Sequence, residues 1–134
     1  MKKFAKIMAL VLVAVMAVAV LTACDGSWSD KPLEARQQVV DKGYVLTDFA
    51  NYTEADGNGQ IGYLIAKKSG SSQSVTLRIY FYDTPTNATI ALEEMEPLLI
   101  LERVSNLNGK LTYKVDGSKI VVRKTLKGLG ALWG

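Results

Sequence analysis

The chain has 134 residues, enough for one domain, and it contains no histidine. This excludes the commonest general base, the usual zinc ligand and every Ser-His or Cys-His nucleophile. The formal charge of +3 comes from Lys2, Lys3 and Lys6. From Cys24 onward, 13 basic residues balance 13 acidic ones, so this part of the chain is neutral. It therefore has no overall positive field that would attract nucleic acid.

The first 23 residues have the pattern of a secretory signal peptide. The start, MKKFAK, is cationic, and residues 7–20 contain only Ile, Met, Ala, Leu and Val. As a helix, residues 7–23 would span roughly 25 Å, less than the ~30 Å hydrocarbon core of a bilayer. A membrane helix retained here would therefore be strained.

The only cysteine, Cys24, follows this apolar run in the stretch Leu21-Thr22-Ala23-Cys24. An aliphatic residue, two small residues and a cysteine resemble the lipobox of bacterial lipoproteins. The resemblance implies that diacylglycerol is attached to the thiol, that residues 1–23 are removed, and that Cys24 anchors the chain to the extracytoplasmic side of the cell membrane. Asp25 resembles a signal for retention at the inner membrane of a Gram-negative cell. The alternatives are a secreted protein that carries Cys24 by chance and an uncleaved anchor helix.

The domain boundaries follow from this leader. Residues 24–31 are expected to form the lipidated N-terminus and a polar tether without stable structure, and residues 32–134 a single domain. Trp28, within the tether, either touches the membrane interface or is a loop residue that is loose or covers the core.

Residues 32–42 are predicted to form a helix. Ser29 or Asp30 can cap it, Pro32 suits its first turn, and Gly43 can end it in a left-handed conformation. Residues 44–50 then have the composition of a strand.

The loop that follows partly matches a calcium-binding loop, EADGNGQIGYLI from Glu54. The match fails at its first position, which is Glu54, and at its twelfth, Ile65, where a bidentate glutamate is required. A β-hairpin loop that leads into a strand at residues 61–67 is favoured, and no metal or cofactor is expected.

Residues 75–82 give the clearest strand signal, because apolar residues alternate with Thr76, Arg78, Tyr80 and Tyr82. The apolar side must face a core. If the other side is uncovered, Arg78, Tyr80 and Tyr82 form a candidate binding surface, since Tyr and Arg are enriched in binding hot spots. The alternative is ordinary cross-strand pairing on a solvent-facing sheet.

Residues 86–105 are predicted to form a second helix, with a kink or break at Pro97. Six residues can share one of its faces: Ile90, Ala91, Met95, Leu98, Leu101 and Val104. Glu93, Glu94 and Glu96 are the densest carboxylates in the chain. Two facing acids could hydrolyse a glycosidic bond, but neighbours on one helix usually diverge toward solvent.

The last hairpin is predicted from strands at residues 110–115 and 119–124, joined around Asp116-Gly117, a strong turn signal. Residues 125–134 have the spacing of a short helix. The basic residues at this end offer a candidate contact with lipid headgroups: Arg123, Lys124 and Lys127.

The expected fold is therefore α+β, an antiparallel sheet of about five strands with helices on one face, in the order α-β-β-β-α-β-β with a further α at the end. With GYVL after the first helix and IYFYD before the second, the mature part resembles small uncharacterised lipoproteins of Gram-positive bacteria, a resemblance that carries no activity across.

The function expected is a non-enzymatic binding module held at the membrane through Cys24, with an envelope protein or cell-wall component as its partner and no role in nucleic-acid binding. The alternatives are a structural envelope component without a discrete ligand and a carboxylate-based hydrolase.

Overall fold

The structure, a computed structural model, describes residues 28–70, 72–106 and 109–127. Its elements are α2 (Pro32–Asp41), β1 (Val45–Asn51), β2 (Gln60–Ser69), β3 (Gln73–Tyr82), α3 (Pro85–Ser105), β4 (Gly109–Asp116) and β5 (Lys119–Lys127). The predicted α+β class and the order α-β-β-β-α-β-β are confirmed. Residues 125–127 continue β5 and are not helical; residues 128–134, the leader and Cys24 lie outside the described residues.

The five strands form one antiparallel sheet in the order β1-β2-β3-β5-β4. Consecutive hairpins join β1 to β2, β2 to β3 and β4 to β5, whereas α3 carries the chain from β3 past β5 to the edge strand β4. The predicted hairpin between β4 and β5 is confirmed, but its two-residue turn is Gly117-Ser118, one residue later than predicted, because Asp116 still pairs with Lys119 and Gly117 has φ +63°. A positive φ favours glycine, which has no Cβ.

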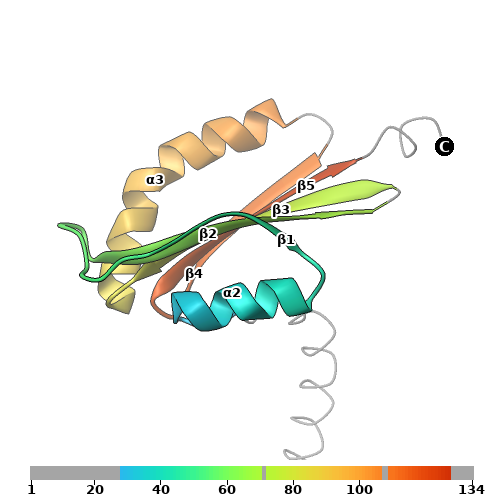
Figure 1. The fold of residues 1–134 in the computed structure, drawn as a ribbon. Coiled ribbons are helices and arrows are strands. Elements are labelled where there is room, and N and C mark those ends of the chain that lie inside the picture. The colour runs from blue at the N-terminus through green and yellow to red at the C-terminus, as the bar shows by residue number, and fades with distance from the viewer. Residues whose placement is uncertain (1–27, 71, 107–108, 128–134) are drawn as a thin grey trace, which may run out of the picture.

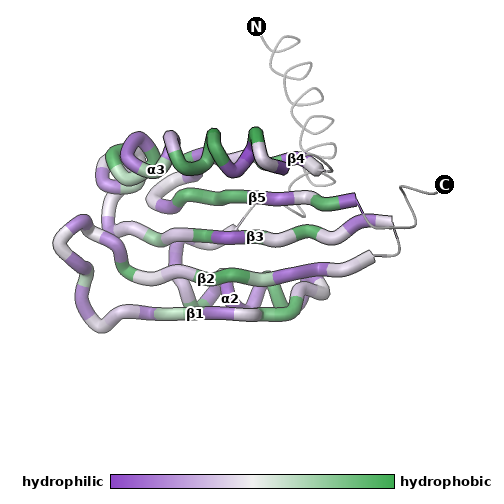
Figure 2. The backbone as a smooth tube through the Cα atoms, turned by 90° about the horizontal axis from the view of Figure 1, so that it is seen from above, coloured by the Kyte–Doolittle hydropathy of each residue, from purple (hydrophilic) through white to green (hydrophobic). Residues whose placement is uncertain are grey.

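The two helices lie on opposite faces of the sheet (Figure 1), so the expectation that they share one face is wrong. Leu77, Ile79 and Phe81 of β3 are fully buried in the cluster that includes α2, and Tyr82 belongs to the cluster that includes α3. The physical reason is β5, where Ile120, Val121 and Val122 are buried one after another. A strand that is apolar on both sides needs cover on both faces. Seen from above, α3 lies along β4 and β5, and α2 lies beneath β1 and β2 (Figure 2).

The folded domain includes Trp28, which lies before the predicted boundary at residue 32. Trp28 is 4% exposed and packs edge-on against Tyr44, with ring centroids 6.0 Å apart and an interplanar angle of 85°. The Lys42 ammonium lies 5.5 Å from the indole. Of the two roles considered for Trp28, the structure shows that it covers the core on the α2 face. The tether without stable structure therefore cannot extend to residue 31.

The expected side-chain cap of α2 is not formed. Lys31 occupies the N-cap position and no side chain caps it. The Ser29 hydroxyl donates instead to Glu34 at 2.8 Å, and Asp30 accepts a hydrogen bond from the Lys119 ammonium at 2.6 Å. Asp30 thus ties the entry of the domain to the β4–β5 turn, where the Lys119 side chain is 3% exposed.

Helix α3 continues through Pro97 without a break. Proline has no N–H to donate to the carbonyl four residues earlier, and the axis of α3 changes direction between its two halves (Figure 1). The side packed on the sheet carries Ala88, Ala91, Leu92, Met95 and Leu99.

The apolar face predicted for α3 is only partly correct. Ala91 and Met95 pack against the sheet, but Leu98, Leu101 and Val104 are 70%, 62% and 70% exposed. This helix carries apolar residues on more than one side, so their spacing does not determine which side is buried.

Candidate cleft between the second helix and the sheet

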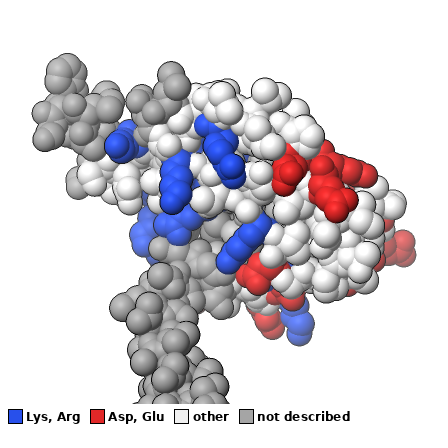
Figure 3. All heavy atoms as spheres, turned by 180° about the vertical axis from the view of Figure 1, so that it is seen from behind, with Lys and Arg blue, Asp and Glu red and all other residues white. Residues whose placement is uncertain are grey.

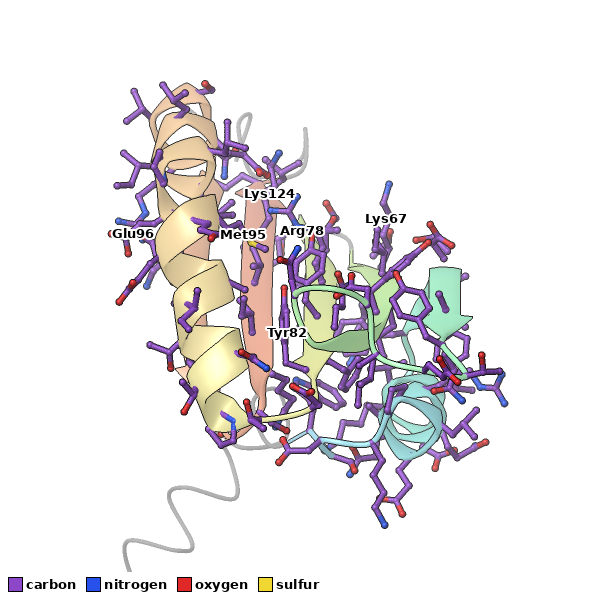
Figure 4. The ribbon with its side chains drawn as sticks, turned by 90° about the vertical axis from the view of Figure 1, so that its left-hand side faces the viewer. Lys67, Arg78, Tyr82, Met95, Glu96 and Lys124 are labelled. Atoms are coloured by element: carbon purple, nitrogen blue, oxygen red, sulfur yellow. The ribbon has the colours of Figure 1, made fainter. Side chains whose placement is uncertain are left out.

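A cleft of about 410 Å³ lies between the first half of α3 and the loop that joins β1 to β2. Its lining residues are Gly57, Asn58, Gln60, Tyr82, Asn87, Ile90, Ala91, Glu94, Met95 and Leu98. Tyr82 and Met95 lie between α3 and the sheet, whereas Glu96 points away from the sheet (Figure 4). The lining therefore combines amides, one carboxylate and one phenol with apolar side chains of α3, around a space large enough for a small molecule.

Tyr82 is the most buried polar side chain of this cleft. The residue is 5% exposed, and its hydroxyl, which no described side chain or backbone group hydrogen-bonds, is open to the cleft. Burial raises the pKa of Tyr82 above its ordinary value, and the negative charges of Asp56 and Glu94 raise it further.

The loop side of the cleft is held by backbone contacts. The Asp56 carboxylate accepts hydrogen bonds from the backbone N–H groups of Asn58 and Gln60, at 2.8 and 2.9 Å. Gly59, with φ +81°, accepts one from the Asp83 N–H at 2.8 Å. The predicted hairpin loop is confirmed, and these bonds fix the loop against the start of α3.

The three clustered acids of α3 differ in their position relative to the cleft. All three are exposed, but Glu94 lines the cleft, whereas Glu93 and Glu96 lie outside it. Among the described lining residues Glu94 is the one carboxylate, so the cleft lacks the facing pair that an acid-base hydrolase requires.

The bare surface proposed for Arg78, Tyr80 and Tyr82 is absent, because α3 covers this part of the sheet. Arg78 donates to Glu102 of α3 at 2.9 Å, Tyr80 is partly buried against the α3 cluster, and Tyr82 is buried. Of the three, Tyr82 belongs to the cleft.

The three basic residues proposed for lipid contact do not share a face. Lys124 lies on the α3 side, 3.5 Å from Glu102. Along β5 it alternates with Arg123 and Lys127, which therefore lie on the α2 side. Lys110 and Lys114 of β4 join that side, because Leu111 between them is buried against α3. Basic residues gather on one part of the surface and acidic residues on another (Figure 3).

Comparisons with protein-family models, with curated protein sequences and with solved structures gave no match. Among residues 28–70, 72–106 and 109–127, no helix has the length and apolarity to span a bilayer, and no three His, Cys, Asp or Glu side chains are grouped as a metal site would need.

Sequence reasoning named Tyr82 and Glu94 but did not bring them together. Gln60 and Asn87 were not named as ligand-binding residues, and Asn58 was considered only as a position of the rejected calcium loop. The helix-capping pattern could have located Asn87, because its backbone N–H donates to the Thr84 hydroxyl at the start of α3. The pairing of the loop with α3 is a long-range contact and leaves no local signal.

We expect the stability of the protein to fall as pH rises above about 10, and Tyr82 to contribute to this fall. Because its pKa is raised in the folded state, the unfolded chain loses this proton first, which favours unfolding. Tyr82→Phe should reduce the slope of the unfolding free energy between about pH 9 and 11, measured by denaturant titration. An unchanged slope would contradict this assignment.

Proposed function

We propose that the protein is a lipid-anchored, extracytoplasmic, non-enzymatic binding module that takes its ligand in the cleft between α3 and the β1–β2 loop. The observation that carries this proposal is the cleft itself, in which the largely buried Tyr82 presents a hydroxyl that is open to the cleft and that no described group hydrogen-bonds. A ligand that reached this hydroxyl would complete its hydrogen bonding.

The lipobox supports the anchor, and the position of Trp28 supports a defined orientation. Trp28 is the fourth residue after Cys24, which limits the distance between them to about 14 Å. Two acyl chains on Cys24 would hold the α2 face, which carries Trp28, close to the headgroups. The cleft is lined by α3. Because α3 lies on the opposite side of the sheet from α2 (Figure 1), the cleft would face away from the membrane.

The basic residues favour the same orientation. Lys110, Lys114 and Lys127 are exposed on the α2 side of the sheet, where anionic headgroups would attract them by about 1 kcal/mol each. Arg123 lies on this side as well. Lys124, paired with Glu102 on the other side, is no longer proposed as a lipid contact.

Lysine acylation tests the orientation. In vesicles that contain anionic lipid, Lys110, Lys114 and Lys127 of the lipidated chain should react severalfold more slowly with an impermeant acylating reagent than in neutral detergent micelles. Lys67 is the matched control, because it is exposed on the α3 side of the sheet (Figure 4). Equal protection of all four lysines, or of none, would contradict the orientation.

Met95 offers a direct reporter of cleft binding. The other methionines, Met1, Met8 and Met16, lie in the proposed leader, so the processed chain would give one methionine methyl resonance. A soluble extract of the envelope of the producing cells should shift this resonance. Ile90→Trp at the cleft rim should abolish the shift, and Leu101→Trp, also exposed but outside the cleft, should leave it. A resonance that no extract moves would contradict the proposed function.

A further inference from the structure

We propose that the cleft recognises a primary alkylammonium group, with the ammonium at Glu94 and Tyr82 and the alkyl chain along the apolar strip of α3. This inference rests on the proposed function, since it assigns a ligand class to the same cleft.

The first support is the balance of hydrogen-bonding groups. The Asn87 side-chain N–H donates to the Asp83 carboxylate at 2.8 Å, and the Gln60 side-chain N–H donates to the Gly62 carbonyl at 3.3 Å. Each amide therefore uses one of its two N–H donors within the protein and keeps its oxygen as an acceptor. A ligand that supplies several donors fits this lining, and a primary ammonium supplies three.

The second support is charge. Glu94 supplies a carboxylate to the cleft, and the described lining contains no lysine or arginine. From Asp83 to Glu102 the chain has acidic residues and no basic ones. Within the loop, Asp56 adds a further negative charge close enough to act on Tyr82. A cationic ligand is favoured at this end of the domain, and an anionic one is disfavoured.

The third support is the apolar strip, which consists of Ile90, Ala91, Met95 and Leu98 on one side of the cleft. An alkyl chain of a few carbons can lie along it and remove it from water. The lining contains one aromatic ring, Tyr82, rather than the several that cage a quaternary ammonium. A primary amine fits this lining better than a methylated one.

The test follows the Met95 methyl resonance of the processed, lipidated chain, purified from cells and held in detergent micelles, during titration with n-butylamine and with n-butanol. Butylamine should bind about tenfold more tightly than butanol, because it adds a charge-assisted hydrogen bond to Glu94. Glu94→Gln should remove this preference. Glu93→Gln, a matched change at the exposed neighbour outside the cleft, should keep it.

Equal binding of the amine and the alcohol, or a preference that survives Glu94→Gln, would overturn the inference. The proposed function would still stand if the envelope extract shifted Met95 through the cleft, so the two failures are distinguishable. A third titration, with Nα-acetyl-lysinamide, separates the sources of the ammonium. Tighter binding than butylamine supports a lysine side chain on a protein partner, and weaker binding supports a free small amine.

Discussion

Replacing Trp28 with alanine is expected to lower the free energy of unfolding by about 3–5 kcal/mol, the cost typical of removing a large buried aromatic side chain. Trp28 is 4% exposed and belongs to the core cluster that contains Ala35, Val39 and Leu77. The change would leave a cavity beneath the sheet and would remove the edge-on contact with Tyr44. Equilibrium denaturation in urea, followed by far-UV circular dichroism, measures the effect.

Tyr52→Ala is the matched control, because Tyr52 is an aromatic residue that is 37% exposed in the β1–β2 loop. It should cost less than about 1 kcal/mol. The account would be contradicted if Trp28→Ala lowered the free energy of unfolding no more than this control. The segment before α2 would then be a tether, as the sequence alone suggested. The short distance from Cys24 to the domain would no longer orient the domain on a membrane.

The second large effect is expected at Cys24. The lipobox resemblance implies that the thiol carries diacylglycerol and that cleavage follows lipidation. Cys24→Ser should therefore abolish lipid incorporation and leave residues 1–23 on the chain. Metabolic labelling with an alkyne fatty acid, together with the size of the product, measures both effects.

Ser27→Ala is the control for this experiment, because it alters a nearby residue outside the lipobox stretch. It should be labelled and processed like the wild type. Labelling that persists in Cys24→Ser, or a wild-type chain that takes up no label, would contradict the anchor.

The strands were predictable because their signals are local. In β3 the alternation of Val75, Leu77, Ile79 and Phe81 with polar residues corresponds to a buried face. The Asp116-Gly117 signal located the β4–β5 hairpin to within one residue, since the turn itself is Gly117-Ser118. The end of α2 was equally clear, since Gly43 has φ +89°.

The layer arrangement was not predictable in the same way. Which side of α3 is buried depends on the partner it meets, and Leu98 and Leu99 are adjacent in the chain but are 70% and 3% exposed. The domain boundary was placed after Trp28 because the neighbours of Trp28 in sequence are polar, whereas its partner Tyr44 lies beyond α2. Both errors concern contacts between residues that are distant in the chain.

In the candidate site, too, single residues could be predicted from the sequence, whereas the contacts between distant residues could not. Tyr82 and Glu94 could each be named from the sequence as candidate site residues. Their association in one cleft depends on the packing of α3 against β3. The polar groups of the β1–β2 loop could not be assigned to the cleft, because the hydrogen bond from Asp83 to Gly59 joins segments on either side of two strands.

The intact mass of the protein purified from its native membrane tests the central claim most directly. The account predicts a chain that begins at Cys24 and carries a diacylglyceryl group on its sulfur. A chain that retains residues 1–23, or one that begins near Cys24 with an unmodified thiol, would contradict it.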